Sequence, residues 1–184
     1  MTQRTVGGRR PTYVSCVLTR LVDGAPIFVR SIRPQDKALL VQGLASMSLR
    51  SRQQRFLGPK SRFTVSELRY LTEVDGIDHV AYVALRADAP RELVAVARLV
   101  RDAVDPGRAE IAITVCDSWQ RRGVGMLLGD LLATAARDRD IRWLTATMAA
   151  DNVAAHRLFD HISTQLCRHS DGPVDELWAD LAAA

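Results

Sequence analysis

Residues 109–128 read AEIAITVCDSWQRRGVGMLL, and a change of period within this stretch decides the fold. In its first half apolar side chains alternate with small or polar ones, which is typical of a half-buried strand. Glu110 and Thr114 share the less apolar face of that strand. After Gly123 and Gly125 the spacing becomes that of an amphipathic helix. The stretch therefore predicts a strand, a glycine-containing turn and a helix in succession.

The turn before the predicted helix has the features of an anion-binding site. Gly123 and Gly125 let the backbone approach a ligand closely, and the first amides of a helix are free donors at the positive end of its dipole. Arg121 and Arg122 add positive charge beside them. The predicted ligand therefore bears phosphate. The open alternative is a surface turn that uses glycine only for its shape.

The spacing excludes the common nucleotide and metal motifs. A dinucleotide fingerprint requires a third glycine where Leu128 stands, and a P-loop requires Gly-Lys-Ser/Thr, whereas Met126 follows Gly125. No His-Glu-x-x-His, Gly-x-Ser-x-Gly or EF-hand pattern occurs in the chain. Three widely spaced cysteines fit neither a disulfide framework nor a zinc site. No metal is therefore expected.

Outward from this stretch, strands and helices follow one another in an order that implies a mixed sheet with helices on its faces. Ser66 is the predicted N-cap of one of these helices. Strands are expected at residues 17–22, 27–32, 79–85, 92–100, 109–116, 141–148, 164–167 and 174–181. Helices are expected at residues 35–47, 48–57, 64–74, 126–137 and 152–161.

The composition indicates one globular domain. The chain has 184 residues, of which 47% are hydrophobic and 25% are charged, a usual balance for a soluble fold. Residues 16–184 are predicted to form the domain, and residues 1–15 a flexible basic tail. Without a long uncharged apolar run or a secretion signal, no membrane partner and a cytoplasmic location are expected. The net charge of +4 suits an anionic ligand, either a phosphate-bearing cofactor or nucleic acid.

The central stretch resembles motif A of the GNAT superfamily of acetyl-CoA-dependent N-acetyltransferases, whose pattern is Gln/Arg-x-x-Gly-x-Gly/Ala at the start of a helix. Gln120 to Gly125 carry that pattern, and Asn152, Ala155 and Leu158 resemble motif B. The resemblance implies an α/β (mixed α+β) GNAT fold. Its central sheet is mostly antiparallel and flanked by helices, with a splay between the family's fourth and fifth strands. The segments at residues 32–36, 51–59 and 71–75 are further similar to bacterial Pat-type protein lysine acetyltransferases.

This resemblance implies acetyl-CoA as the co-substrate and a binding site made largely of backbone groups. The pantetheine arm would lie along Ile113, Thr114 and Val115. Asn152 would support that arm in addition to capping its own helix. The pyrophosphate would rest on the backbone amides of Arg121, Arg122, Gly123, Val124, Gly125 and Met126.

The resemblance also assigns chemistry to Glu110, which stands where several family members carry a catalytic glutamate. A lysine amine has a reference pKa near 10.4, so a base must remove a proton before the amine can attack. By strand rise three residues span about 10 Å, which would place the Glu110 carboxylate one water away from chemistry near Ile113. The open alternatives are a solvated carboxylate or a partner for Arg98 or Arg108. Phe159 stands at the position of the family's proton-donating tyrosine, and a phenyl ring cannot donate.

Three functions follow from these features. The first is an acetyl-CoA-dependent N-acetyltransferase acting on a primary amine, with a protein lysine preferred over a small-molecule amine because of the Pat-type segments. The second is a GNAT-fold sensor or scaffold that binds acyl-CoA, which Phe159 favours. The third is nucleic-acid binding through the basic tail and the basic run at residues 50–62. It ranks last because no helix-turn-helix or aromatic RNA motif accompanies these segments. A homodimer stays open as an oligomeric state.

Overall fold

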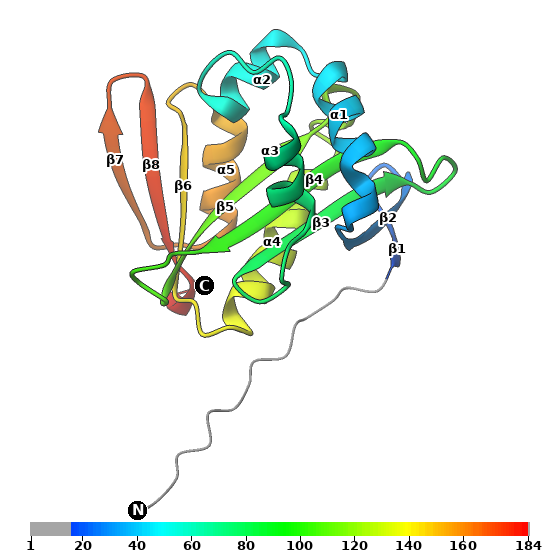
Figure 1. The fold of residues 1–184 in the computed structure, drawn as a ribbon. Coiled ribbons are helices and arrows are strands. Elements are labelled where there is room, and N and C mark those ends of the chain that lie inside the picture. Colours follow the sequence, from blue (N-terminus) through cyan, green and yellow to red (C-terminus); the bar gives the residue numbers. More distant parts are fainter. Residues whose placement is uncertain (1–15, 184) are drawn as a thin grey trace, which may run out of the picture.

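The computed structural model describes residues 16–183, which fold around a mixed β-sheet (Figure 1). Within that range the sheet has eight strands in the order β1-β2-β3-β4-β5-β6-β8-β7. Neighbouring strands are antiparallel except β5 and β6, which run parallel. The strands are β1 (Val17–Arg20), β2 (Pro26–Ser31), β3 (His79–Arg86), β4 (Leu93–Arg101), β5 (Arg108–Val115), β6 (Trp143–Ala149), β7 (Leu166–Asp171) and β8 (Val174–Asp180). The expected mixed sheet is confirmed, whereas the expected tail at residues 1–15 lies outside the described residues.

Helices cover both faces of the sheet, with α1, α2 and α3 on one face and α4 and α5 on the other (Figure 1). Their bounds are α1 (Lys37–Ser46), α2 (Leu49–Phe56), α3 (Val65–Thr72), α4 (Val124–Arg137) and α5 (Val153–Ile162), with 3-10 helices at Pro34–Asp36, Asp117–Trp119 and Leu181–Ala183. The central strands β3 and β4 are accordingly buried on both faces and are rich in Val, Ala and Leu. None of the helices within residues 16–183 combines the length and apolar character needed to cross a membrane.

Each face of the sheet has its own hydrophobic core. Behind the sheet, Leu128 and Leu132 of α4 and Phe159 of α5 are almost completely buried. In front of it, Leu40 of α1 packs in a cluster with Val83 of β3. Burial of this kind contributes roughly 1.5–3 kcal/mol for each large apolar side chain. The two cores hold β4 and β5 from both sides and thereby fix the position of the backbone edge that faces β6.

β5 and β6 separate along their length. They pair only from Arg108 opposite Trp143 to Glu110 opposite Thr145, although β5 continues to Val115 and β6 to Ala149. The strands thus form the splay that the family resemblance implies. The fourth and fifth strands of that family pattern correspond to β5 and β6 here, because the β1–β2 hairpin adds a strand at the edge of the sheet.

The N-cap of α3 lies two residues before the predicted one. Thr64 Oγ1 accepts a hydrogen bond from the Glu67 N–H at 3.2 Å, and the Glu67 carboxylate accepts one from the Thr64 N–H at 2.7 Å. This reciprocal pair is a capping box, which satisfies two backbone donors that the helix leaves free. The prediction of Ser66 as the cap was therefore wrong, because Thr64 and Glu67 have the required spacing of three residues.

The packing of α4 on α5 depends on Gly129. A Cβ built at Gly129 would lie 2.5 Å from Leu158 Cδ1, a side chain that is itself buried. We expect Gly129→Val to lower the free energy of unfolding by about 2 kcal/mol, because extra carbon in a filled core forces side chains out of their preferred rotamers. Urea unfolding monitored by circular dichroism measures the change. The control is Thr134→Val on the exposed side of α4, which should stay within about 0.5 kcal/mol of the unsubstituted protein; equal losses would contradict the packing argument.

Candidate functional site

The splay exposes one backbone edge of β5. The Cys116 N–H donates to the Val94 carbonyl at 2.9 Å. This bond shows that the backbone groups of Cys116 point toward β4. Because these directions alternate along an antiparallel pair, Thr114 also bonds toward β4, whereas Ile113 and Val115 direct their N–H and C=O groups toward β6. No strand pairs with them there within the described part of the chain. The Val115 carbonyl accepts from Gln120 Nε2 at 3.2 Å, which leaves the Ile113 groups and the Val115 N–H open to a ligand.

The N-terminus of α4 lies at the end of the same strand and presents free amides. The first intrahelical bond runs from the Leu127 N–H to the Gly123 carbonyl at 3.0 Å, so the preceding N–H groups of the first turn have no partner within the helix. Gly123 has a φ of +86°, which favours glycine, and a Cβ at Gly125 would meet no neighbouring side chain or loop within 4 Å. Arg121 also has a positive φ, of +60°. This turn forms a concave set of donors that suits an anion.

The two arginines of the turn differ in what they contact. The Arg122 guanidinium pairs with the Asp23 carboxylate and lies 4.1 Å from the centre of the Trp119 ring. Its charge is therefore partly neutralised by Asp23 of the β1–β2 hairpin. The Arg121 side chain is exposed. The backbone amides of the turn, with Arg121, remain as its donors.

Asn152 lies beyond the end of β6, at the start of α5. Its Oδ1 accepts from the Ala155 N–H at 3.2 Å, so the predicted N-cap is confirmed. One turn further along α5, His156 Nε2 lies 3.0 Å from the Asp175 carboxylate of β8. Phe159 is buried in the core behind the sheet with 1% of its surface exposed. Because α5 follows the end of β6 directly, its N-terminus, like that of α4, lies near the splay.

Glu110 is exposed at the closed end of the splay, as the last residue of β5 that pairs with β6. Arg108 pairs with Asp102 instead, and Arg98 bonds to His79 and to a backbone carbonyl. The two alternatives that made Glu110 an ion-pair partner of these arginines were therefore wrong. Its carboxylate is on the same face of β5 as Thr114 and acts electrostatically on Arg55 of α2.

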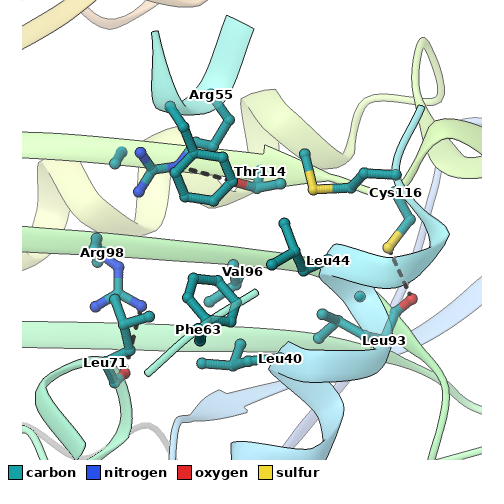
Figure 2. A pocket seen from close by; sticks show the side chains of 14 residues that line it. Leu40, Leu44, Arg55, Phe63, Leu71, Leu93, Val96, Arg98, Thr114 and Cys116 are labelled. Atoms are coloured by element: carbon teal, nitrogen blue, oxygen red, sulfur yellow. Dashed lines mark hydrogen bonds between the residues drawn. The ribbon is translucent and has the colours of Figure 1, made fainter. Parts of the chain in front are cut away.

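On this face of the sheet, a cavity of about 50 Å³ lies beneath α1 and α2 (Figure 2). Ala112, Thr114 and Cys116 of β5 form one wall, in line with Glu110. Most of the remaining lining is apolar, and it is contributed by Leu40, Gly43, Leu44, Met47, Phe56, Phe63, Leu71, Leu93 and Val96. Cys116 donates its thiol hydrogen to the Leu93 carbonyl at 3.2 Å, and burial raises the pKa of that thiol.

Two arginines complete the lining of this cavity. Arg55 Nε donates to Thr114 Oγ1 at 3.0 Å, and Arg98 enters from β4 (Figure 2). Burial lowers the pKa of both guanidinium groups; that of Arg98 falls to about 10, with the positive charge of Arg55 as the second cause. Neither arginine was predicted from the sequence as a site residue. A charged residue within the apolar run 93–100 was the available signal for Arg98, whereas Arg55 was hidden in a basic run that resembles a solvated helix face.

Asp117 joins the cavity to the anion-binding turn. Its carboxylate accepts from the Ser48 N–H at 2.8 Å and from the Ser51 hydroxyl, both at the start of α2. It also accepts from Gln120 Nε2 at 3.0 Å, immediately before the turn. Ser48 caps α2 as well, because its Oγ accepts from the Ser51 N–H. One carboxylate therefore fixes the position of α2 relative to the loop between β5 and α4.

Comparison with known proteins identifies the family. The Acetyltransferase (GNAT) family matches residues 47–162. The protein Acetyltransferase Pat of Mycolicibacterium smegmatis is 28% identical over 166 residues, which are 90% of this chain and 49% of that protein. Acetyltransferase PA5475 of Pseudomonas aeruginosa is 28% identical over 139 residues, 75% of this chain and 74% of that protein. This chain thus spans about half the length of the M. smegmatis relative.

Solved structures agree with these sequence matches. The GNAT domain of S. lividans PAT is similar with a TM-score of 0.80 at 28% identity, covering 90% of this chain and 97% of that chain. A cAMP-binding acyltransferase from Mycobacterium smegmatis has a TM-score of 0.62 at 25% identity, covering 91% of this chain and 47% of the other. The region matched by the family contains the splay, the anion-binding turn and α5. The chain belongs to the GNAT family of acetyltransferases.

Proposed function

We propose that this protein transfers an acetyl group from acetyl-CoA to a primary amine, with Glu110 as the general base. The observation that carries the proposal is the arrangement around the splay. An open backbone edge, the free amides of α4 and a carboxylate at the closed end all converge on one gap beside a cavity. This arrangement is what a long thioester with a diphosphate at one end and a reacting carbonyl at the other requires.

The groups around the splay fit acetyl-CoA in order along its length. The amides from Arg121 to Met126 would hold the pyrophosphate, with the open space at Gly125 allowing close approach. The amide-bearing pantetheine arm would bond to the open backbone groups of Ile113 and Val115 in the manner of an added strand. Asn152 would support the other side of that arm through its side-chain amide, which is a free donor while Oδ1 caps α5.

Thr114 belongs to the acceptor side in this proposal. Its backbone bonds toward β4, and its hydroxyl accepts from Arg55 within the cavity. From the sequence, Thr114 was expected to contact the pantetheine arm together with Ile113 and Val115. Because side chains of neighbouring strand residues point to opposite faces, Thr114 is better suited to contact the amine substrate.

The reaction requires one general base and one hydrogen-bond donor that stabilises the developing oxyanion. The acceptor arrives largely as an ammonium ion, and Glu110, directly or through one water, takes a proton from it. The amine nitrogen then bonds to the thioester carbonyl carbon while a backbone N–H such as that of Val115 stabilises the charge that develops on the oxygen. The newly bonded nitrogen gives up its second proton to water, the carbon–sulfur bond breaks, and the thiolate of CoA leaves. Phe159 is buried and has no acidic hydrogen, so water supplies the proton to the thiolate in this scheme.

Calorimetric titration tests the proposal directly. Acetyl-CoA titrated into the purified full chain is expected to bind with a dissociation constant in the micromolar range, about −8 kcal/mol. CoA and desulfo-CoA serve as controls, because both keep the diphosphate and the pantetheine arm. Absence of binding by all three in low and in moderate salt would overturn both the acetyltransferase and an acyl-CoA sensor.

A further inference from the structure

The two arginines at one end of the cavity beneath α1 and α2 form no ion pair with a carboxylate of the described residues. Arg98 is 6% exposed, and Arg55 is half-buried above it. Figure 2 shows both guanidinium groups at the same end of the cavity, with Cys116 at the opposite end. No carboxylate within residues 16–183 forms an ion pair with either one.

The groups that Arg98 does contact are neutral. One nitrogen lies 3.1 Å from His79 Nε2, and the other is 3.4 Å from the Leu71 carbonyl. Burial, together with the charge of Arg98, lowers the pKa of His79 to about 4. The imidazole is therefore neutral at pH 7 and accepts the Arg98 hydrogen. A guanidinium has five donors, so Arg98 retains donors that these contacts do not use.

Two other arginines with little exposed surface, Arg139 and Arg30, show how such a group is normally satisfied. Arg139 is 4% exposed and donates to three backbone carbonyls, at 2.9, 2.7 and 2.7 Å. Arg30 forms a two-pronged ion pair with the buried Asp36 carboxylate, at 2.6 and 2.7 Å. Arg98 has a single backbone carbonyl at 3.4 Å and no carboxylate, and Arg55 has the Thr114 hydroxyl as its hydrogen-bond acceptor and the Phe56 ring beside it. An unpaired buried charge is costly, so this end of the cavity is suited to an anion that arrives from outside.

We propose that Arg55 and Arg98 bind a carboxylate of the acceptor, and that the acceptor is a small amino carboxylate such as an α-amino acid. This inference rests on the proposed function, since it assumes that the amine enters through this cavity. Arginine fits a carboxylate through parallel hydrogen bonds. Glu110 acts electrostatically on Arg55 but not on Arg98, so one of the two positive charges remains for the acceptor to neutralise.

The neighbouring groups set the shape of that acceptor. Ala112 and Thr114 lie between the arginines and the open backbone edge of β5, so a carboxylate held by Arg55 and Arg98 places an amine a few bonds away near Glu110 and the thioester. The apolar lining by Leu40, Leu44 and Phe63 suits an apolar side chain (Figure 2). A lysine within a protein presents its amine on a neutral chain and brings no carboxylate of its own. The cavity therefore favours the small-molecule class over the protein lysine that the Pat-type segments favour.

Matched substrate pairs test the charge requirement. L-Valine, L-leucine, L-methionine and L-phenylalanine are compared with their carboxamides, and CoA release is followed with a thiol reagent. At least one acid is expected to exceed its amide about tenfold in kcat/KM. The amide has the less basic amine and hence more of the reactive form, which biases the comparison against the proposal. A lysine peptide with blocked ends is the third acceptor.

Variants assign the preference to the two arginines. Arg98→Gln and Arg55→Gln are each expected to remove the preference for acid over amide and to leave the dissociation constant of acetyl-CoA unchanged. Arg55 is half-buried on α2, so its variant should fold even where Arg98→Gln unfolds. The control is Arg62→Gln, an exposed arginine that does not line the cavity. It should behave as the unsubstituted protein.

Three outcomes would overturn the inference without touching the proposed function. One is binding of acetyl-CoA with equal turnover of acids and amides. Another is a lysine peptide that is the best of the acceptors and is insensitive to Arg55→Gln. The third is a preference for succinyl-CoA over acetyl-CoA that is lost in the arginine variants, which would assign the carboxylate to the acyl donor. Failure to bind acetyl-CoA at all would instead overturn the proposed function.

Discussion

Glu110→Gln is expected to lower kcat about a thousandfold while leaving the affinity for acetyl-CoA unchanged. General base catalysis contributes typically a hundredfold to ten-thousandfold, and glutamine keeps the shape of the side chain without its ability to take a proton. The affinity should persist because the groups proposed to hold the co-substrate belong to the turn before α4 and to the open edge of β5. Single-turnover kinetics and calorimetry on the same preparation measure the two quantities.

This variant also separates the enzyme from an acyl-CoA sensor. Glu92→Gln, which removes an exposed carboxylate in the turn between β3 and β4, is the matched control and should retain full activity. The rate should also recover partly at high pH, where more of the amine is already deprotonated. Unchanged turnover in Glu110→Gln would remove the general base from the mechanism, and a protein that binds acetyl-CoA but shows no turnover in any form would be a sensor.

Gly125→Val is expected to weaken acetyl-CoA binding about a hundredfold, or roughly 2.7 kcal/mol. A Cβ at Gly125 meets no neighbouring side chain or loop within 4 Å, so the fold has room for the first carbon of a side chain there. The same space is where the pyrophosphate would approach the amides, and a branched side chain there blocks hydrogen bonds to a charged group. Calorimetric titration of acetyl-CoA provides the dissociation constant.

A smaller substitution at Gly125 serves as the control for the valine variant. Gly125→Ala adds one carbon and should cost less affinity than valine, because its side chain reaches less far into the space above the amides. Thermal unfolding should be unchanged within about 0.5 kcal/mol for both. If valine at this position left the affinity intact, the turn before α4 would not be the diphosphate site.

The parts of the fold that the sequence predicted share a strong local signal. Residues 109–128 carry a change of period and two glycines, and the structure contains the strand, turn and helix expected there. The cap of α3 also has a local signal, because Thr64 and Glu67 have the spacing of a capping box, but the prediction placed the cap at Ser66. The separation of β5 from β6 has no local signal, since it depends on where two distant strands stop pairing. Only the family resemblance implied it.

The candidate site was predictable where the backbone forms it and hidden where the tertiary structure assembles it. Gly123 and Gly125 mark the anion-binding turn through conformational requirements that a sequence records directly. The acceptor end depends on Arg55 and Arg98, which are 43 positions apart in the printed sequence and meet only because α2 packs over β4 and β5. Periodicity assigns a residue to a face of its own element, and it does not say which residue of another element lies opposite.

The shared carboxylate of Asp117 makes the two halves of the site thermodynamically dependent on each other. One set of hydrogen bonds holds both the start of α2, which covers the acceptor cavity, and the loop that leads to the diphosphate turn. A ligand that orders the loop is therefore expected to order the start of α2 as well, and linkage makes such an effect reciprocal. Binding of either substrate is then expected to raise the affinity for the other, through a side chain that does not line the cavity.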